Sequence, residues 1–99
     1  MKTITLCGST KFKSEYEECN KKLTLEGNIV ISVGLFGHAD KVNLTKEQKS
    51  LLDEIHLRKI DLSDEIFVIN VGGYIGESTQ KEIGYAKAKG KVIGYLEKR

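Results

Sequence analysis

The sequence predicts an α/β fold, a small doubly wound parallel sheet with the element order βαβαβαβ. Two observations predict it. Apolar residues switch several times between the period-two or continuous β-branched runs of strands and the three-to-four-residue spacing of helices. The connections between the expected elements are short, and the chain has no proline. Strands that alternate with helices pair in parallel through right-handed crossovers, which gives a Rossmann- or flavodoxin-like architecture.

The composition predicts a single globular domain over residues 1–99. A chain of 99 residues, 39% of them apolar, is too short for two ordinary domains. Sixteen basic against fourteen acidic residues leave a net charge of +2, which excludes the dense basic surface of a dedicated DNA or RNA binder. No apolar run approaches the roughly 20 residues of a membrane span, and the first residues lack the apolar core of a secretion signal. Cys7 and Cys19 form neither a metal spacing nor a disulfide framework, so we expect a reduced, cytoplasmic protein with no membrane or nucleic-acid partner.

The first strand is expected over residues 2–7, which alternate in polarity and end at Gly8. An amphipathic helix follows, because apolar residues then recur at helical spacing. The members of this apolar stripe are Phe12, Tyr16, Cys19 and Leu23. Gly27 stands where a helix commonly ends, just past the last apolar residue of the stripe.

The second strand is expected within residues 28–33, where a β-branched run suits a strand covered on both faces. Residues 34–43 hold two glycines and no clear period, which predicts a loop. Thr45 and Gln48 form a capping-box pattern that opens the second helix. The stripe expected to be buried in that helix consists of Leu51, Leu52, Ile55, Lys59 (through its methylene groups) and Leu62.

The third strand is expected over residues 66–69 with Val71, followed by a glycine-rich turn at 72–76. A third helix over 77–89 and a fourth strand over 92–96 complete the chain. Doubly wound sheets bind ligands beyond the carboxyl ends of their strands, where the strand order reverses. The turns after the first three strands therefore should line one cleft; they are residues 8–11, 34–43 and 72–79.

The first of these turns is a candidate anion site. Gly8 lets the backbone approach a ligand, and free amides at the helix start with the hydroxyls of Ser9 and Thr10 suit a phosphate or carboxylate. The alternative is that Ser9 or Thr10 only caps the helix. The turn has neither the Walker A spacing nor the G-x-G-x-x-G pattern.

The glycine-rich turn is the second candidate. Its expected ligand-binding residues are Gly73, Gly76, Ser78 and Thr79. Glu82 lies one helical turn further, and we expect its carboxylate to point toward the cleft. The alternative is that Thr79 and Glu82 form a capping box, in which Glu82 only accepts the Thr79 amide.

The remaining acids and histidines carry weaker signals. Asp64 opens the third strand, where an acid is commonly a solvated charge. His56 lies in the second helix and His38 in the loop, and a lone helical histidine is more often a surface or half-buried residue than a catalyst. Two histidines so far apart, with no Cys or Glu at ligand spacing, predict no metal site.

Several segments resemble one family in order along nearly the whole chain. They are Leu6-Cys7-Gly8-Ser9, Asp64 ahead of an apolar strand, and Glu82-Ile83-Gly84-Tyr85-Ala86 followed by Gly90-Lys91. This pattern is similar to the nucleoside 2-deoxyribosyltransferase superfamily, which includes the 2'-deoxynucleoside 5'-phosphate N-hydrolases. The glycine-rich turn also resembles the P-G-G-x-G-T-x-x-E motif of nucleotide N-ribosidases related to lysine-decarboxylase-like proteins.

The resemblance implies specific roles. Glu82 would be the nucleophile that attacks the anomeric carbon, and Asp64 would assist proton delivery to the leaving base. Gly8 and Ser9 would contact the sugar or 5'-phosphate. Family members usually carry another acid on the helix before the third strand; His56 occupies roughly that place and is the other candidate proton donor. The resemblance implies no metal or redox cofactor. It does imply a homo-oligomer.

Two functional hypotheses follow. The first is an enzyme that cleaves or transfers the N-glycosidic bond of a (deoxy)nucleoside or its 5'-monophosphate, with a carboxylate stabilising an oxocarbenium-like transition state. The alternative is a nucleotide-binding module or sensor without turnover, in which Glu82 is only a cap. A cleft that serves a partner protein is a third possibility.

Overall fold

The computed structural model describes residues 1–98 and confirms the predicted α/β fold. Its elements are β1 (Thr3–Gly8), α1 (Lys13–Leu25), β2 (Ile29–Ile31), α2 (Lys46–Asp61), β3 (Glu65–Ile69), a short 3₁₀ turn η1 (Val71–Gly73), α3 (Glu77–Ala88) and β4 (Val92–Tyr95). Among the helices of this range, none is long and apolar enough to cross a membrane.

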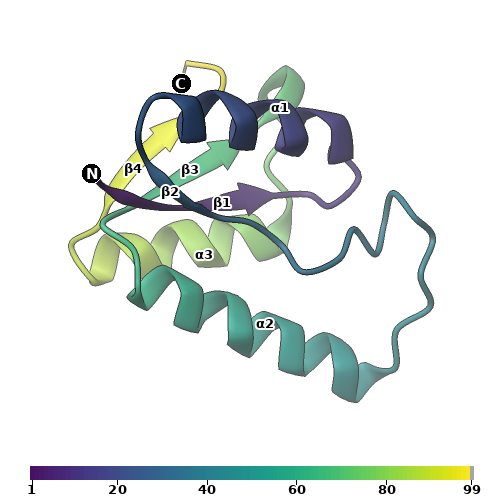
Figure 1. Ribbon diagram of the computed structural model, residues 1–99. Helices are drawn as coiled ribbons and strands as arrows, with labels where there is room; N and C mark the ends of the chain where they lie inside the picture. Colours follow the sequence, from purple (N-terminus) through teal and green to yellow (C-terminus); the bar gives the residue numbers. More distant parts are fainter. Residues whose placement is uncertain (99) are drawn as a thin grey trace.

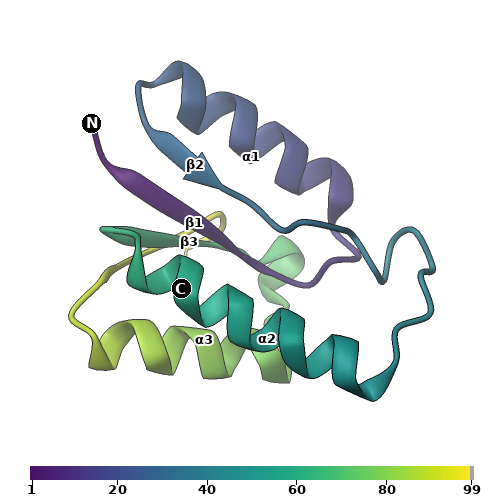
Figure 2. The ribbon, with the colours of Figure 1, turned by 60° about the horizontal axis from the view of Figure 1, so that its bottom comes forward.

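The four strands described here form one parallel sheet in the order β2-β1-β3-β4. The helix α1 covers one face, while α2 and α3 lie side by side on the other (Figures 1 and 2). The chain leaves β1 for β2 at the edge and then crosses back to β3, so the strand order reverses between β1 and β3. Ligand sites of doubly wound folds lie at the carboxyl ends of the two strands that flank this reversal.

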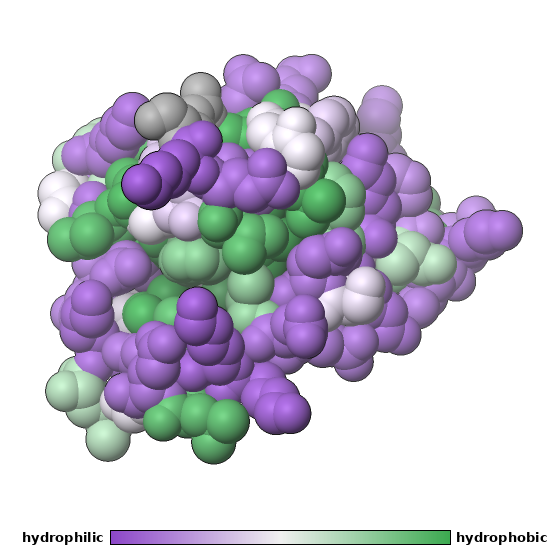
Figure 3. Space-filling view, turned by 90° about the horizontal axis from the view of Figure 1, so that it is seen from above, coloured by the Kyte–Doolittle hydropathy of each residue, from purple (hydrophilic) through white to green (hydrophobic). Residues whose placement is uncertain are grey.

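Strand alternation divides the core into two layers. Cys7, Ile66 and Val68 point toward α2 and α3, whereas Leu6 and Ile69 point toward α1 and pack with Tyr16. In the part of the chain described, α1 is the only α-helix on its face, and Figure 3 shows apolar side chains reaching the surface there. Cys7 therefore faces the two helices α2 and α3.

The buried stripe predicted for α2 is wrong by about one residue. The helix buries His56 and Ile60, while Leu51 and Leu62 are 59% and 74% exposed. The apolar pattern was misleading because a histidine occupies a sheet-facing position. Thr45 does form the predicted capping box, with its hydroxyl accepting from the Gln48 amide.

The prediction that the second strand is covered on both faces is also wrong. The strand β2 lies at the edge of the sheet, and Ile29 is half exposed. A continuous β-branched run does not by itself distinguish a central strand from an edge strand.

Candidate active site

A cleft of about 760 Å³ opens at the carboxyl ends of the strands. Its walls come from all three predicted turns, from one side of α2 and from the first turns of α3. Among the residues that line it are Gly8, Ser9, Thr10, His56, Gly76, Ser78, Thr79 and Glu82. Asp64 is not among the lining residues, and Gly73 instead lines a separate, shallower hollow with Ile75, Gln80 and Tyr95.

Gly8 ends β1, where it pairs with Ile69 of β3. Its φ is +148°, and a Cβ there would lie 2.9 Å from the Ile69 carbonyl oxygen. Both features require glycine. The Gly8 carbonyl accepts a 2.8 Å hydrogen bond from the Tyr16 hydroxyl, which ties the turn to α1.

The hydroxyls after Gly8 do not cap α1, so the capping alternative for them is wrong. The N-cap is Phe12, and within residues 1–98 no side chain caps it. The Thr10 hydroxyl instead accepts from the His38 amide at 3.1 Å, which joins the first turn to the long loop after β2. The Ser9 hydroxyl accepts from the Lys11 amide. Both side chains line the cleft.

The capping-box alternative for Glu82 is also wrong. The N-cap of α3 is Gly76, and no side chain of the described chain caps that end. Thr79 is already inside the helix and is buried, so Glu82 stands in the second turn. Its carboxylate is free to face the cleft, as predicted, and its side chain is 16% exposed.

Asp64 lies at the other end of the sheet. Its amide donates to the Thr3 carbonyl at 2.8 Å, and its carboxylate accepts from the Thr3 amide at 2.9 Å. A residue that precedes a strand lies at the amino edge of a parallel sheet, whereas Glu82 follows β3 at the carboxyl edge. The structure therefore does not bring Asp64 and Glu82 together, and the role expected for Asp64 in proton delivery needs another residue.

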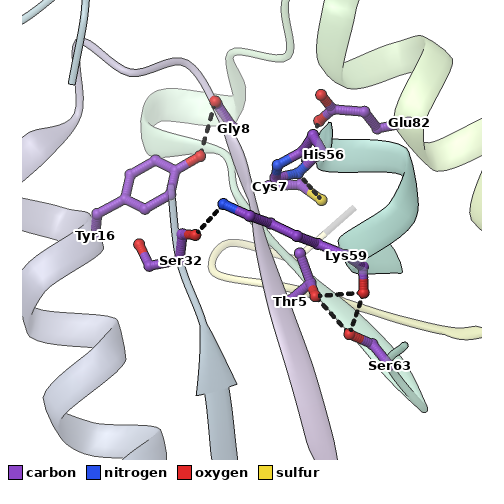
Figure 4. A network of polar contacts seen from close by, with 9 residues as sticks. All are labelled: Thr5, Cys7, Gly8, Tyr16, Ser32, His56, Lys59, Ser63 and Glu82. Carbon is purple, nitrogen blue, oxygen red and sulfur yellow. Dashed lines mark hydrogen bonds and ion pairs between the residues drawn. The ribbon is translucent and has the colours of Figure 1, made fainter. Parts of the chain in front are cut away.

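Three chemically active side chains meet at the cleft: His56 and Glu82 line it, and the fully buried Cys7 contacts His56. They are Cys7 from β1, His56 from α2 and Glu82 from α3 (Figure 4). The Cys7 Sγ lies 3.3 Å from the His56 Nε2, and the Glu82 Oε1 lies 3.7 Å from the same nitrogen. Cys7 and His56 are buried, so the cluster is open to solvent chiefly through the cleft.

Burial sets the protonation of this cluster. It lowers the pKa of His56 to about 4, with the Lys59 charge adding to the effect. It raises the pKa of Glu82 to about 7, with the Asp53 charge adding to it, and raises the pKa of the Cys7 thiol well above its ordinary value. At neutral pH His56 is therefore a neutral imidazole, which argues against the expectation that it delivers a proton as an imidazolium.

Sequence reasoning missed two charged residues on the cleft wall. Asp53 and Lys59 lie three residues before and after His56, which places them on the same side of α2. The Lys59 ammonium donates to the Ser32 carbonyl at 2.8 Å, and burial lowers its pKa. The helical spacing around His56 was the signal that could have found them.

The rim of the cleft combines aromatic and basic groups. The Lys11 ammonium lies 3.9 Å from the centre of the Tyr74 ring, within the range of a cation–π contact. Tyr74 lines the cleft, together with Lys49 and Lys81. A basic rim above a carboxyl group on the floor suits a ligand with an anionic end and a polar, uncharged body.

No protein-family model matches the chain, and no curated protein matches its sequence. The resemblance to the deoxyribosyltransferase superfamily accordingly rests on the motifs quoted above.

Proposed function

We propose that the protein cleaves or transfers the N-glycosidic bond of a (deoxy)nucleoside or its 5'-monophosphate, with Glu82 as the nucleophile. One observation carries this proposal: the Glu82 carboxyl group lies on the floor of the cleft at the strand-order reversal, largely buried and with no capping role. An ionised carboxylate held in such a place can approach a sugar carbon from one face while the base leaves from the other.

The reaction would proceed in two displacements. The Glu82 carboxylate forms a bond to the anomeric carbon as the carbon–nitrogen bond breaks, and the bonding pair leaves with the base, which gains a proton. Water, or a ring N–H of a second base, then attacks the same carbon. The carbon–oxygen bond to Glu82 breaks, its electron pair returns to the carboxylate, and the proton of the acceptor passes to the acid that served the leaving base. Hydrolysis and transfer differ only in which acceptor performs this second step.

Asp53 is the candidate for proton delivery in place of Asp64. It lines the cleft from α2, and its charge acts on Glu82 strongly enough to contribute to the raised pKa of that group. A second carboxyl group in the same cleft supports a role at the leaving base, since general acids must come within hydrogen-bond reach of the atom they protonate. The neutral His56 would then orient Glu82.

A 5'-phosphate finds partners in the same cleft. Ser9, Thr10 and Ser78 line it, as does Lys81, whose ammonium lies 3.7 Å from the Glu77 carboxylate. These groups support a preference for nucleoside monophosphates over nucleosides, because hydroxyls and lysines recognise phosphate oxygens. Calorimetric titration with matched pairs, such as deoxyguanosine and its monophosphate, measures the preference; equal affinities would remove the phosphate role.

The proposal extends to compartment and assembly. Cys7 and Cys19 are free and buried, which is consistent with a reducing, cytoplasmic setting. From the resemblance to the nucleoside 2-deoxyribosyltransferase superfamily we propose a homo-oligomer. Analytical ultracentrifugation measures the oligomeric state directly.

The deciding experiment is release of free base from each deoxynucleoside and its monophosphate. We expect turnover in the wild type and a loss of at least about a hundredfold in Glu82→Gln, since the amide cannot attack. Glu77→Gln is the matched control, because Glu77 lies in the same helix, also lines the cleft and is exposed. A near wild-type rate in Glu82→Gln would exclude the nucleophile. Nucleotide binding without turnover in the wild type would favour the binding-module alternative.

A further inference from the structure

We propose that Cys7, His56 and Glu82 form a binding site for a divalent transition metal of the zinc class. One ligand atom from each residue, a thiol sulfur, a ring nitrogen and a carboxylate oxygen, lies within 4.8 Å of the other two. The three residues come from three different elements, and two of them, His56 and Glu82, line the cleft. This inference does not depend on the glycosidic reaction.

The orientation of the imidazole distinguishes a metal site from a proton relay. In a nucleophile–histidine–acid relay the two partners contact different ring nitrogens. Here the Cys7 sulfur and the Glu82 oxygen both approach Nε2 (Figure 4). Three ligand atoms that face one another in this way surround a common point, which is where a metal ion would lie.

The distances fit a tetrahedral ion. Metal–ligand bonds of about 2.0–2.3 Å place neighbouring ligand atoms about 3.3–3.7 Å apart. The observed separations are 3.3 Å between Cys7 Sγ and His56 Nε2 and 3.7 Å between His56 Nε2 and Glu82 Oε1. Side-chain adjustments of a few tenths of an ångström would bring these two pairs to bonding geometry. The third pair, the Cys7 sulfur and a Glu82 carboxylate oxygen, lies within 4.8 Å and would need to close by up to about 1 Å.

The donor set selects the metal. A thiolate, a neutral imidazole and a carboxylate are the ligands of zinc and of similar borderline ions, not of magnesium or calcium. On binding, the metal displaces the thiol proton, and the carboxyl proton where Glu82 holds one, and both go to solvent. The fourth position faces the cleft, which His56 and Glu82 line, so water or a ligand can occupy it.

The proposed site runs against the sequence-based expectation of no metal site, which the titration below would decide. Linear spacing could not reveal it, because Cys7 and His56 are 49 residues apart and meet only through the fold. Metal binding would also exclude glycosyl attack, since the ion occupies the Glu82 carboxylate. Zinc would then act as an inhibitor that a chelator removes.

Titration of chelator-stripped protein with Co²⁺ tests the proposal, since tetrahedral Co²⁺ absorbs in the visible and thiolate ligation adds a near-ultraviolet charge-transfer band. We expect one equivalent to bind with both signatures and Zn²⁺ to displace it. Cys7→Ser should lose the charge-transfer band and weaken Zn²⁺ binding at least about tenfold. Cys19→Ser and His38→Gln are matched controls, because they replace the other free cysteine and the other histidine of the chain. Both variants should bind as the wild type does.

A second readout guards against a variant that fails to fold. Zn²⁺ should raise the thermal midpoint of the wild type and of Cys19→Ser, because an ion that binds only the folded chain stabilises it. The increase should disappear in Glu82→Gln and His56→Gln. Circular dichroism of the metal-free variants verifies that they fold. Absence of one-equivalent binding to the wild type, or equal binding by Cys7→Ser, would overturn the proposal. Neither result bears on base release, which is measured in chelator.

Discussion

The His56 imidazole and the Glu82 carboxyl group meet 3.7 Å apart between α2 and α3, and burial shifts both toward their neutral forms. The contact joins the two helices on one face of the sheet at the end where the ligand cleft opens. The two largely buried groups therefore have protonation states that a bound ligand or ion can change.

The first prediction concerns which aspartate, Asp53 or Asp64, protonates the leaving base. We expect Asp53→Asn to lower base release at least about tenfold, because Asp53 lines the cleft and Asp64 does not. Asp64→Asn should leave turnover unchanged and reduce stability by about 1 kcal/mol, since it weakens the hydrogen bond to the Thr3 amide. Steady-state rates and urea unfolding of the two variants measure these effects. Equal loss of activity in both would remove the assignment to Asp53.

Much of the fold could be predicted because hydrophobic periodicity and the signals that begin or end helices are local features of the sequence. Every helix and strand appears where its hydrophobic period placed it, and Thr45 caps α2 as its pattern requires. The same pattern at Thr79 fails because Gly76 begins α3 one turn earlier and leaves Thr79 inside the helix. A capping motif is thus readable only once the start of its helix is known.

The site was less predictable because it depends on which edge and which layer each residue occupies. The position of Asp64 follows from strand polarity alone, since residues before a parallel strand lie far from the carboxyl edge. The meeting of Cys7 with His56 required knowing which face of α2 is buried, and the apolar pattern gave that face wrongly. The burial that shifts the pKa of Glu82 has no counterpart in the local sequence.

The buried Glu82 makes stability depend on pH in a stated direction. Because the folded chain raises the pKa of Glu82 from 4.5 to about 7, the folded state holds the proton more tightly than the unfolded state. Stability from this group is then lost as pH rises from 4.5 to 7 and is constant above that, a change of up to about 3 kcal/mol. His56 acts oppositely, because its lowered pKa makes the folded protein lose stability as pH falls from 6.5 toward 4. This contribution is present both in the wild type and in Glu82→Gln.

Glu82→Gln isolates this effect, since glutamine does not titrate. The variant should gain stability relative to the wild type as pH rises from 4.5 to 7, and the difference should then remain constant. Urea unfolding at a series of pH values, in chelator, measures it. A difference that does not change with pH would contradict the burial of an ionisable Glu82.

Gly8 provides the last prediction, which concerns the backbone that supports the cleft. An alanine at this position would need a φ of +148° and a Cβ placed 2.9 Å from the Ile69 carbonyl oxygen and 3.2 Å from the Ile69 Cβ. Since β3 cannot withdraw without breaking its pairing with β1, we expect Gly8→Ala to cost about 2–4 kcal/mol of unfolding free energy. Gly27→Ala is the matched control, because Gly27 also has a positive φ of +94° but nothing lies within 4 Å of the added Cβ. It should cost only about 1 kcal/mol, the strain of the backbone alone. Urea unfolding of both variants measures the difference, and equal costs would show that the close approach of β1 and β3 does not require glycine.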